Sequence, residues 1–276
     1  EFSFDKIMLS IYLKNNPVDF ALQKWDYKII AWSSLEEIIS TFKAWPAKLD
    51  DKVRIIEWRN IFDIDNYLTQ KWLIKSWAFI KEAKNVSAYK NDYSFLSSAL
   101  TLEWFLYPDT YFINPNNFTL SVLIKKQLDV FESKIYTPLL KNKTSAEIVE
   151  IVNLASILEK EANHFTLDEE KTIAWILKKR YEDNWMIWAD ITACYAYELT
   201  ENECKMSVSK YIAEKNAYNT RTKTGLPKTP ILNPRINSIK AVLNPINTEY
   251  WFYLHDANWN VHYAKTNTEH NINRWK

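Results

Sequence analysis

Two glutamates in one apolar segment are the residues of this chain best suited to acid–base chemistry. Glu159 and Glu161 stand in the run 154–162, LASILEKEA, which has the composition of a mostly buried helix. At about 100° per residue, Glu159 falls within the apolar stripe that includes Ile148 and Val152, whereas Glu161 lies about 200° further around. An acid on such a helix can have a raised pKa, as a general acid needs. The spacing alone leaves open a surface acid or a structural ion pair.

The elements that must position this segment are mostly helices. Thr144 and Glu147 form the pattern of a capping box, so the glutamate helix should begin there and run to about His164. Helices around a small antiparallel sheet indicate an α+β fold. The other predicted elements are helices at 118–134, 169–181 and 196–215, a loop at 217–237, a short helix at 238–243, and hairpin strands at 251–255 and 261–263.

The N-terminal part contains two similar strand–turn–helix units. In the first, a strand at 27–30 precedes a capping box of Ser33 and Glu36, which opens a helix. In the second, a strand at 53–56 precedes Asn60, which should cap a helix over 61–70. Two such units predict a small α+β module, which we interpret as a binding or spacer domain.

The composition is that of an ordinary globular protein. The chain has 276 residues, 25% of them charged and 47% hydrophobic, with a net charge of +1. No long basic block favours nucleic-acid binding, and no apolar run reaches the roughly 18 residues of a membrane span. Cys194 and Cys204 form neither a disulfide scaffold nor a Cys-x-x-Cys metal site, so we interpret them as free thiols.

Tryptophan is unusually frequent and glycine is nearly absent. The chain has 13 tryptophans and one glycine, where about 7% glycine is usual. Trp259 follows Asn258 between the hairpin strands, and Trp72 follows a helix, and both positions favour glycine. We infer that most tryptophans stand for glycines of the natural protein, as when UGA codons for glycine are translated as tryptophan. The alternative is a genuinely tryptophan-rich glycan binder.

Several motifs, in order along nearly the whole chain, resemble those of one family. Residues 102–111 (LEWFLYPDTY) are similar to LEGFLFPDTY, and residues 154–161 (LASILEKE) are similar to LASIVEKE. Residues 218–234 carry YNT, GLP, PI and NP, and AVLNP at 241–245 and EHN at 269–271 complete the series. The chain thus resembles the YceG-like endolytic murein transglycosylases. The segment around Asp190 departs from the family pattern, because it lacks a Gln and a Pro.

The resemblance implies a fold and a reaction. It implies a LysM-like subdomain over residues 1–85 and a YceG-like catalytic domain over residues 86–276. The family cleaves the β-1,4 bond between N-acetylmuramic acid and N-acetylglucosamine of nascent strands, leaving a 1,6-anhydro end. One carboxyl group can serve as acid and then as base. The resemblance assigns this role to Glu161, with Glu159 as a supporting acid; periodicity keeps Glu159 as the rival.

Further site residues follow from the same resemblance. Asp190, Tyr218, Asn219 and Thr220 are expected to bind substrate, and Glu103 to brace the site. The alternatives are a turn cap for Asp190 and a loop clamp without ligand for residues 218–220. No cofactor and no metal are expected.

A murein substrate implies a place outside the cytoplasmic membrane. Together with the non-Met start, it leads us to expect a single-pass N-terminal anchor in the full-length protein, with this chain on the outer face of the bacterial cell membrane. The expected partners are peptidoglycan glycan strands and cell-wall synthases. A catalytically silent peptidoglycan-binding scaffold is the alternative function. The discriminating feature is whether Glu161 faces a groove lined by Tyr218 to Thr220.

Overall fold

The computed structural model describes residues 14, 33–44, 51–114, 118–162, 166–258 and 260–275. It divides into two compact units, residues 1–50 and 51–276. The described residues of the first unit are 14 and 33–44, and they include helix α2 (Leu35–Ala44). Its capping box uses Ser34 and Glu37, whose side chains each accept the other's backbone N–H, and not Ser33 and Glu36 as predicted. The strand predicted at 27–30 lies outside the described residues.

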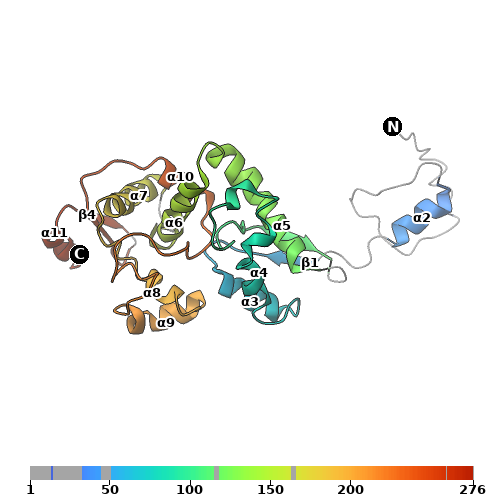
Figure 1. Cartoon of the computed structure of the whole chain (residues 1–276), viewed down its shortest axis with the longest axis horizontal. Helices are drawn as coiled ribbons and strands as arrows, with labels where there is room; N and C mark the ends of the chain where they lie inside the picture. The colour runs from blue at the N-terminus through green and yellow to red at the C-terminus, as the bar shows by residue number, and fades with distance from the viewer. Residues whose placement is uncertain are drawn as a thin grey trace. The chain divides into compact units, whose positions relative to one another are not determined.

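The second unit is a mixed helical body with two small antiparallel sheets, which confirms the α+β fold. Strand β1 (Asp51–Arg54) pairs with β2 (Thr110–Ile113), and β3 (Phe252–His255) pairs with β4 (Val261–Ala264). Figure 1 shows α6, α7 and α10 between these two sheets. The described helices are α3 (Ile61–Gln70), α4 (Ala78–Ala83), α5 (Leu120–Phe131) with a π-helical continuation (Glu132–Leu140), α6 (Ser145–Ala162), α7 (Leu167–Glu182), α8 (Ile191–Tyr195), α9 (Glu201–Tyr211), α10 (Ile236–Leu243), α11 (Asn267–Asn273), and short 3-10 turns at Val86–Ala88 and Ser94–Leu96.

Local sequence signals account for several of these elements. Asn60 caps α3 with a complete capping box, and the helix has the predicted bounds. Thr144 and Glu147 likewise form the box that opens α6. The C-terminal hairpin is present, whereas α11 was not predicted. Because β1 pairs with β2, the second N-terminal strand belongs to the body that begins at Asp51, and a domain boundary at residue 85 stays a prediction.

Helix α6 runs through the core of this body. It packs against α7 and α10, and Ile148, Val152, Ala155 and Ile157 on it are all buried. An 18-residue helix surrounded in this way has a fixed rotation about its axis. Side chains near its C-terminal end therefore have set directions.

The two cysteines are not free thiols as we predicted. Helices α8 and α9 pack against each other, which brings the Cα atoms of Cys194 and Cys204 to 5.6 Å, and the two residues form a disulfide. The prediction was wrong because the spacing along the chain gave no sign that the two short helices fold back on each other.

Among the helices in the described part of the chain, none has the length and apolar character that a membrane span requires.

Four tryptophans have left-handed backbone angles. Trp58, Trp72, Trp77 and Trp188 have φ between 57° and 70°. Trp72 closes a Schellman motif after α3, since its N–H bonds to Thr69 O and the next N–H bonds to Leu68 O. Glycine adopts such angles without the steric cost that a Cβ atom adds.

We expect Trp72→Gly to stabilise the protein by about 1–2 kcal/mol, because it removes a Cβ atom from a left-handed position. The side chain is 94% exposed, so its loss removes little packing. Trp275 is the matched control, being 91% exposed and without a positive φ. Urea denaturation should show a higher midpoint for Trp72→Gly and none of this gain for Trp275→Gly; equal shifts in both variants would contradict the strain at Trp72.

Candidate active site

The last turns of α6 send three consecutive charged side chains to three different neighbours. Glu159 points into the core toward α10, Lys160 toward α9, and Glu161 into an open cleft. The reason is helical rotation, which separates adjacent side chains by about 100°.

Glu159 is a buried acid whose two oxygens both accept hydrogen bonds. Its side chain is fully buried. Arg235 donates its backbone N–H to Oε2 at 2.9 Å and its Nε to Oε1 at 2.7 Å. Ser238 also donates its hydroxyl to Oε2, at 2.6 Å. A carboxylate held in this way stabilises the start of α10 and has no access to a ligand.

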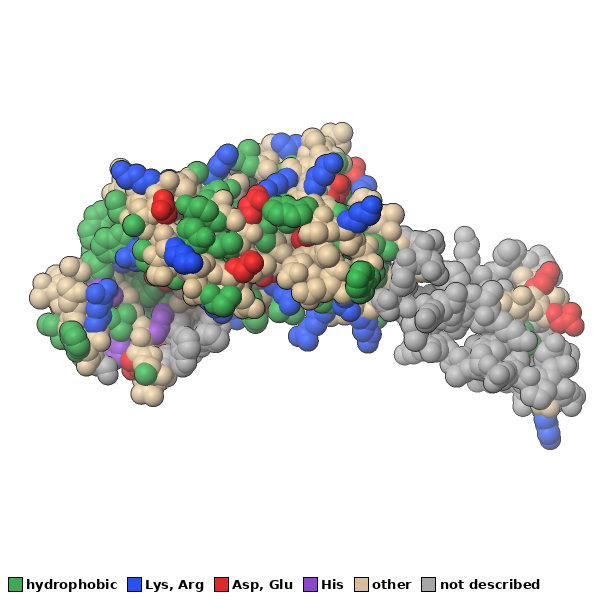
Figure 2. Space-filling view, turned by 90° about the horizontal axis from the view of Figure 1, so that it is seen from below, with side chains coloured by type: hydrophobic (Ala, Val, Ile, Leu, Met, Phe, Trp, Pro, Cys, Tyr) green, Lys and Arg blue, Asp and Glu red, His purple; other side chains and the backbone are tan. Residues whose placement is uncertain are grey.

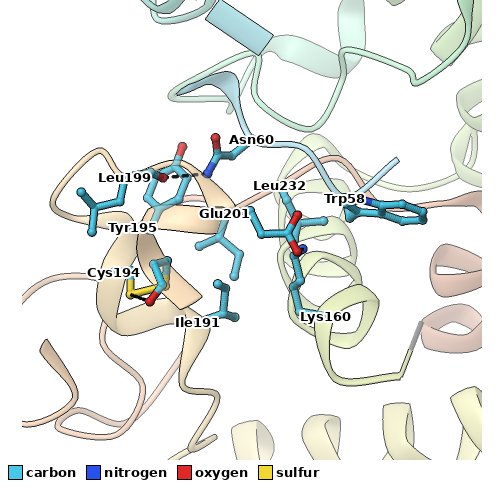
Figure 3. A pocket seen from close by; sticks show the side chains of 11 residues that line it. Trp58, Asn60, Lys160, Ile191, Cys194, Tyr195, Leu199, Glu201 and Leu232 are labelled. Atoms are coloured by element: carbon cyan, nitrogen blue, oxygen red, sulfur yellow. Dashed lines mark hydrogen bonds and ion pairs between the residues drawn. A yellow bond between two sulfur atoms is a disulfide. The ribbon is translucent and has the colours of Figure 1, made fainter. Parts of the chain in front are cut away.

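Lys160 joins α6 to the segment that contains α8 and α9. Its Nζ lies 2.7 Å from a carboxylate oxygen of Glu201, and both side chains are largely buried. Figure 3 shows this pair beside the Cys194–Cys204 disulfide and the hydrogen bond from Asn60 to the Leu199 carbonyl. These contacts fix the position of α8, which directly follows the predicted site residue Asp190.

Glu161 lies on the wall of a cleft of about 350 Å³. The side chain is half-buried, and the Tyr253 hydroxyl on β3 donates a hydrogen bond of 2.9 Å to its Oε2. The other residues that line the cleft come from α7, the two loops near Asp190 and Thr220, β3 and α11. They are Arg180, Trp188, Arg221, Phe252, Asn267, His270, Asn271 and Arg274.

The surroundings of Glu161 favour its protonated form. Burial is the main cause and raises its pKa from the ordinary 4.5 to about 7. The hydrogen bond from Tyr253 opposes this shift, as do the charges of Arg180 and Arg221, whereas Asp190 adds to it. A carboxyl group that is half protonated near neutral pH can both donate and retrieve a proton.

Arg180 holds the cleft together through backbone carbonyl groups. It is 5% exposed, and it donates from Nε to Trp251 O at 3.0 Å and from Nη1 to Ile187 O at 2.7 Å. These bonds tie α7 to the start of the hairpin and to the loop before α8. The hairpin in turn brings Tyr253 to Glu161.

Asp190 and the loop over residues 218–221 meet at the cleft in a different way from our prediction. Asp190 forms an ion pair of 2.6 Å with Arg221, which lines the cleft. Asn219 is fully buried, and its side-chain N–H groups donate to three backbone carbonyls of residues 211–214. Thr220 is also buried and shares a 2.9 Å hydrogen bond with Thr192. This geometry favours the loop-clamp interpretation for Asn219 and Thr220.

Tyr218 and Glu103 lie at a second cavity. Tyr218 lines a space of about 360 Å³ with Tyr195, and its hydroxyl lies 3.1 Å from that of Thr229. Glu103 is fully buried and is bonded to two residues that line this space, because it accepts hydrogen bonds from the Ile61 N–H at 2.7 Å and the Tyr195 hydroxyl at 2.6 Å. Burial raises the Glu103 pKa to about 8. Neither side chain lines the cleft of Glu161.

Of the residues that line the cleft, sequence reasoning predicted only Glu161 as a site residue; those that it missed include Arg180, Arg221, Tyr253 and Arg274. Arg180 and Arg221 stand within or beside family motifs, but nothing in the spacing linked them to Glu161. His270 belongs to the EHN motif; its ring stacks on Phe252 at 5.2 Å and also borders the cleft. Histidine side chains gather at the end of the molecule that carries β4 and α11 (Figure 2).

Comparison with known proteins gives consistent matches. A profile of the YceG-like family matches residues 4–276. An endolytic murein transglycosylase of Bacillus subtilis (strain 168) is 31% identical over 173 residues, which cover 62% of this chain and 46% of that protein. The aligned part is thus just under half of that relative's length. The crystal structure of a yceG-like protein from Listeria monocytogenes matches with a TM-score of 0.67 and 24% identity, over 96% of this chain and 89% of that one, and shows the shared fold.

The raised pKa of Glu161 predicts a pH-dependent stability. Between pH 4.5 and about 7 the folded chain binds more protons at this position than the unfolded chain, so stability should fall as the pH rises through that window. Glu161→Gln removes the free-energy cost of holding an ionised carboxylate in this buried position. We expect it to raise the free energy of unfolding by about 1–3 kcal/mol at pH 8 and to leave it nearly unchanged at pH 4.

Glu159→Gln is the matched comparison for this measurement. It breaks a buried ion pair, so we expect it to destabilise the protein by about 3 kcal/mol at pH 8. Urea titrations of both variants at the two pH values separate the roles. A loss of stability at pH 8 in Glu161→Gln as well would contradict the assignment of Glu161 as an acid for which the cost of burial exceeds the attraction of Arg180 and Arg221.

Proposed function

Since the chain belongs to the YceG-like family, we propose that it is a lytic transglycosylase that cleaves murein glycan strands endolytically. The observation that carries the proposal is the half-buried Glu161, whose pKa lies near 7 and which opens onto a cleft. The B. subtilis relative that is named an endolytic murein transglycosylase supports the substrate. The feature that separates this function from a silent binding protein is present in part, because Glu161 faces a cleft, but the cleft is lined by Arg221 and not by Tyr218 to Thr220.

The proposed reaction uses Glu161 twice. As an acid it gives its proton to the glycosidic oxygen between N-acetylmuramic acid and N-acetylglucosamine, and the bond from that oxygen to C1 breaks. The acetamido group of the muramyl unit stabilises the positive charge at C1. The Glu161 carboxylate then takes the proton of the C6 hydroxyl, while the oxygen of that hydroxyl forms a bond to C1. The product is a 1,6-anhydro end, and no water is consumed.

The neighbours of Glu161 support the second half of this cycle. Tyr253 donates to Oε2, and Arg180 lies near enough for its charge to favour the carboxylate. Both stabilise the anion that forms when the leaving group departs. Glu159 supports the site indirectly, because its bonds to Arg235 and Ser238 hold α6 in place.

Three further proposals concern the whole protein. The first two rest on the family resemblance, and the third rests on backbone angles. The N-terminal residues 1–85 are a LysM-like module that holds the glycan. A membrane anchor outside this chain places the catalytic domain on the outer face of the membrane, where cell-wall synthases make its substrate. The tryptophans at left-handed positions, such as Trp58 and Trp188, stand for glycines of the natural protein, and the gene's codons at these positions decide this point.

Glu161→Gln should abolish cleavage of uncrosslinked glycan strands while keeping their binding, because an amide has the same shape but cannot exchange the proton. We expect a loss of at least about 10²-fold in turnover. Glu150→Gln makes the same chemical change at an exposed position of α6 and should keep full activity. Mass spectrometry of the products of the unsubstituted protein should show anhydro ends. Reducing ends would indicate hydrolysis and contradict the proposal. Unchanged cleavage by Glu161→Gln would show that Glu161 is not the acid of the reaction.

The pH profile gives a second test through Tyr253. Glu161 must be protonated to act as the acid, so kcat/KM should fall as the pH rises through about 7. The Tyr253 hydrogen bond lowers the Glu161 pKa, so Tyr253→Phe should raise it and move this decline to higher pH, with a lower kcat. Tyr136→Phe, on the π-helical segment away from the cleft, is the control. A decline that stays at the same pH in Tyr253→Phe would show that Glu161 is not the titrating acid.

A further inference from the structure

The cleft beside Glu161 carries more positive charge than its own acids can balance. Arg180, Arg221 and Arg274 line it, against the carboxyl group of Glu161 and the nearby Asp190. Glu161 has to be protonated to begin the proposed reaction, which leaves Asp190 as the anion. Sugar hydroxyl and acetamido groups are neutral and do not require this excess of guanidinium groups.

The three arginines differ in what they are bonded to. Arg180 is buried and donates to backbone carbonyls, so it is part of the framework. Arg221 is paired with Asp190. Arg274 is exposed and forms no ion pair with any residue in the described part of the chain. Arg274 is therefore the cation of the cleft that is open to a ligand.

Arg274 stands at the end of a polar helical face. Asn267, His270, Asn271 and Arg274 line the cleft, and their spacing of three, four and seven residues places them on one side of α11. Asn267 and Asn271 are exposed and can donate amide N–H groups to the same ligand as Arg274. This wall thus combines a guanidinium group with neutral donors, which is the set that binds a carboxylate.

The part of the cleft lining at Arg221 is less suitable for an anion. The Asp190 carboxylate lies there beside Arg221 at 2.6 Å, so it offsets the attraction of that arginine and repels a second carboxylate. A negatively charged group on a bound strand is therefore steered to the α11 side of the cleft.

We propose that the Asn267–Asn271–Arg274 face of α11 binds a carboxylate carried by a muramyl unit of the glycan strand, and so makes the enzyme selective for acidic strands. This inference rests on the proposed function for the identity of the strand. The shared chemistry is a carboxylate on the muramyl unit. It has two sources, the free lactyl group of a peptide-free unit and the carboxylates of an attached stem peptide.

The test measures binding without cleavage. The dissociation constants of end-labelled strands are measured for Glu161→Gln and for Glu161→Gln combined with Arg274→Gln. Four strand preparations are used: peptide-free strands, uncrosslinked peptide-bearing strands, and each of these after its carboxylates have been converted to methylamides. Lys141→Gln in the same background removes one positive charge at an exposed position after the π-helical segment, away from the cleft, and is the matched control for net charge.

We expect Arg274→Gln to weaken binding of the acidic strands by about five- to tenfold and to have no such effect on the methylamide strands. An effect confined to peptide-free strands assigns the lactyl carboxylate, and one confined to peptide-bearing strands assigns the stem peptide. The inference is overturned by equal weakening of acidic and methylamide strands, by no weakening, by the same loss in Lys141→Gln, or by no binding of any strand. Cleavage by the unsubstituted protein tests the proposed function separately.

Discussion

The site depends on the fixed rotation of α6, which holds one carboxyl group at the edge of a cleft and partly out of water. Glu159 and Lys160 help to fix the rotation of this helix about its axis. Glu159 does so through Arg235 and Ser238, and Lys160 through Glu201. With these residues anchored on either side, Glu161 can point only toward the cleft. Its burial there keeps the pKa near 7, and the chemistry that we propose follows from that value.

The rest of the second unit brings distant segments to this one position. Arg180 of α7 reaches the carbonyls of Ile187 and Trp251, and so joins the loop before α8 to the beginning of the C-terminal hairpin. The hairpin brings Tyr253 to Glu161, and α11 contributes its polar face to the lining of the cleft. Because Arg180 acts through backbone atoms, it can place these elements without depending on the side chains that they carry.

Local signals predicted much of the fold, and long-range pairing explains what they missed. Capping boxes predicted the starts of α3 and α6, because the groups that form a cap are neighbours in sequence. Periodicity separated Glu159 from Glu161, since both stand on one helix. The Cys194–Cys204 disulfide and the bond between Tyr253 and Glu161 depend on how helices and strands pack, and no local pattern encodes that. Asn219 and Thr220 had the residue types of a binding loop, but their polar atoms satisfy buried backbone and side-chain groups instead.

The most direct test of this account is the ionisation of Glu161 itself. The chain can be labelled with ¹³C at the glutamate carboxyl carbons and titrated by NMR, and the Glu161 resonance identified as the one missing from the Glu161→Gln spectrum. We predict a midpoint near pH 7 for this resonance. A midpoint near the ordinary glutamate value of about 4.5 would show that the cleft does not hold a proton on Glu161, and would contradict its role as the acid.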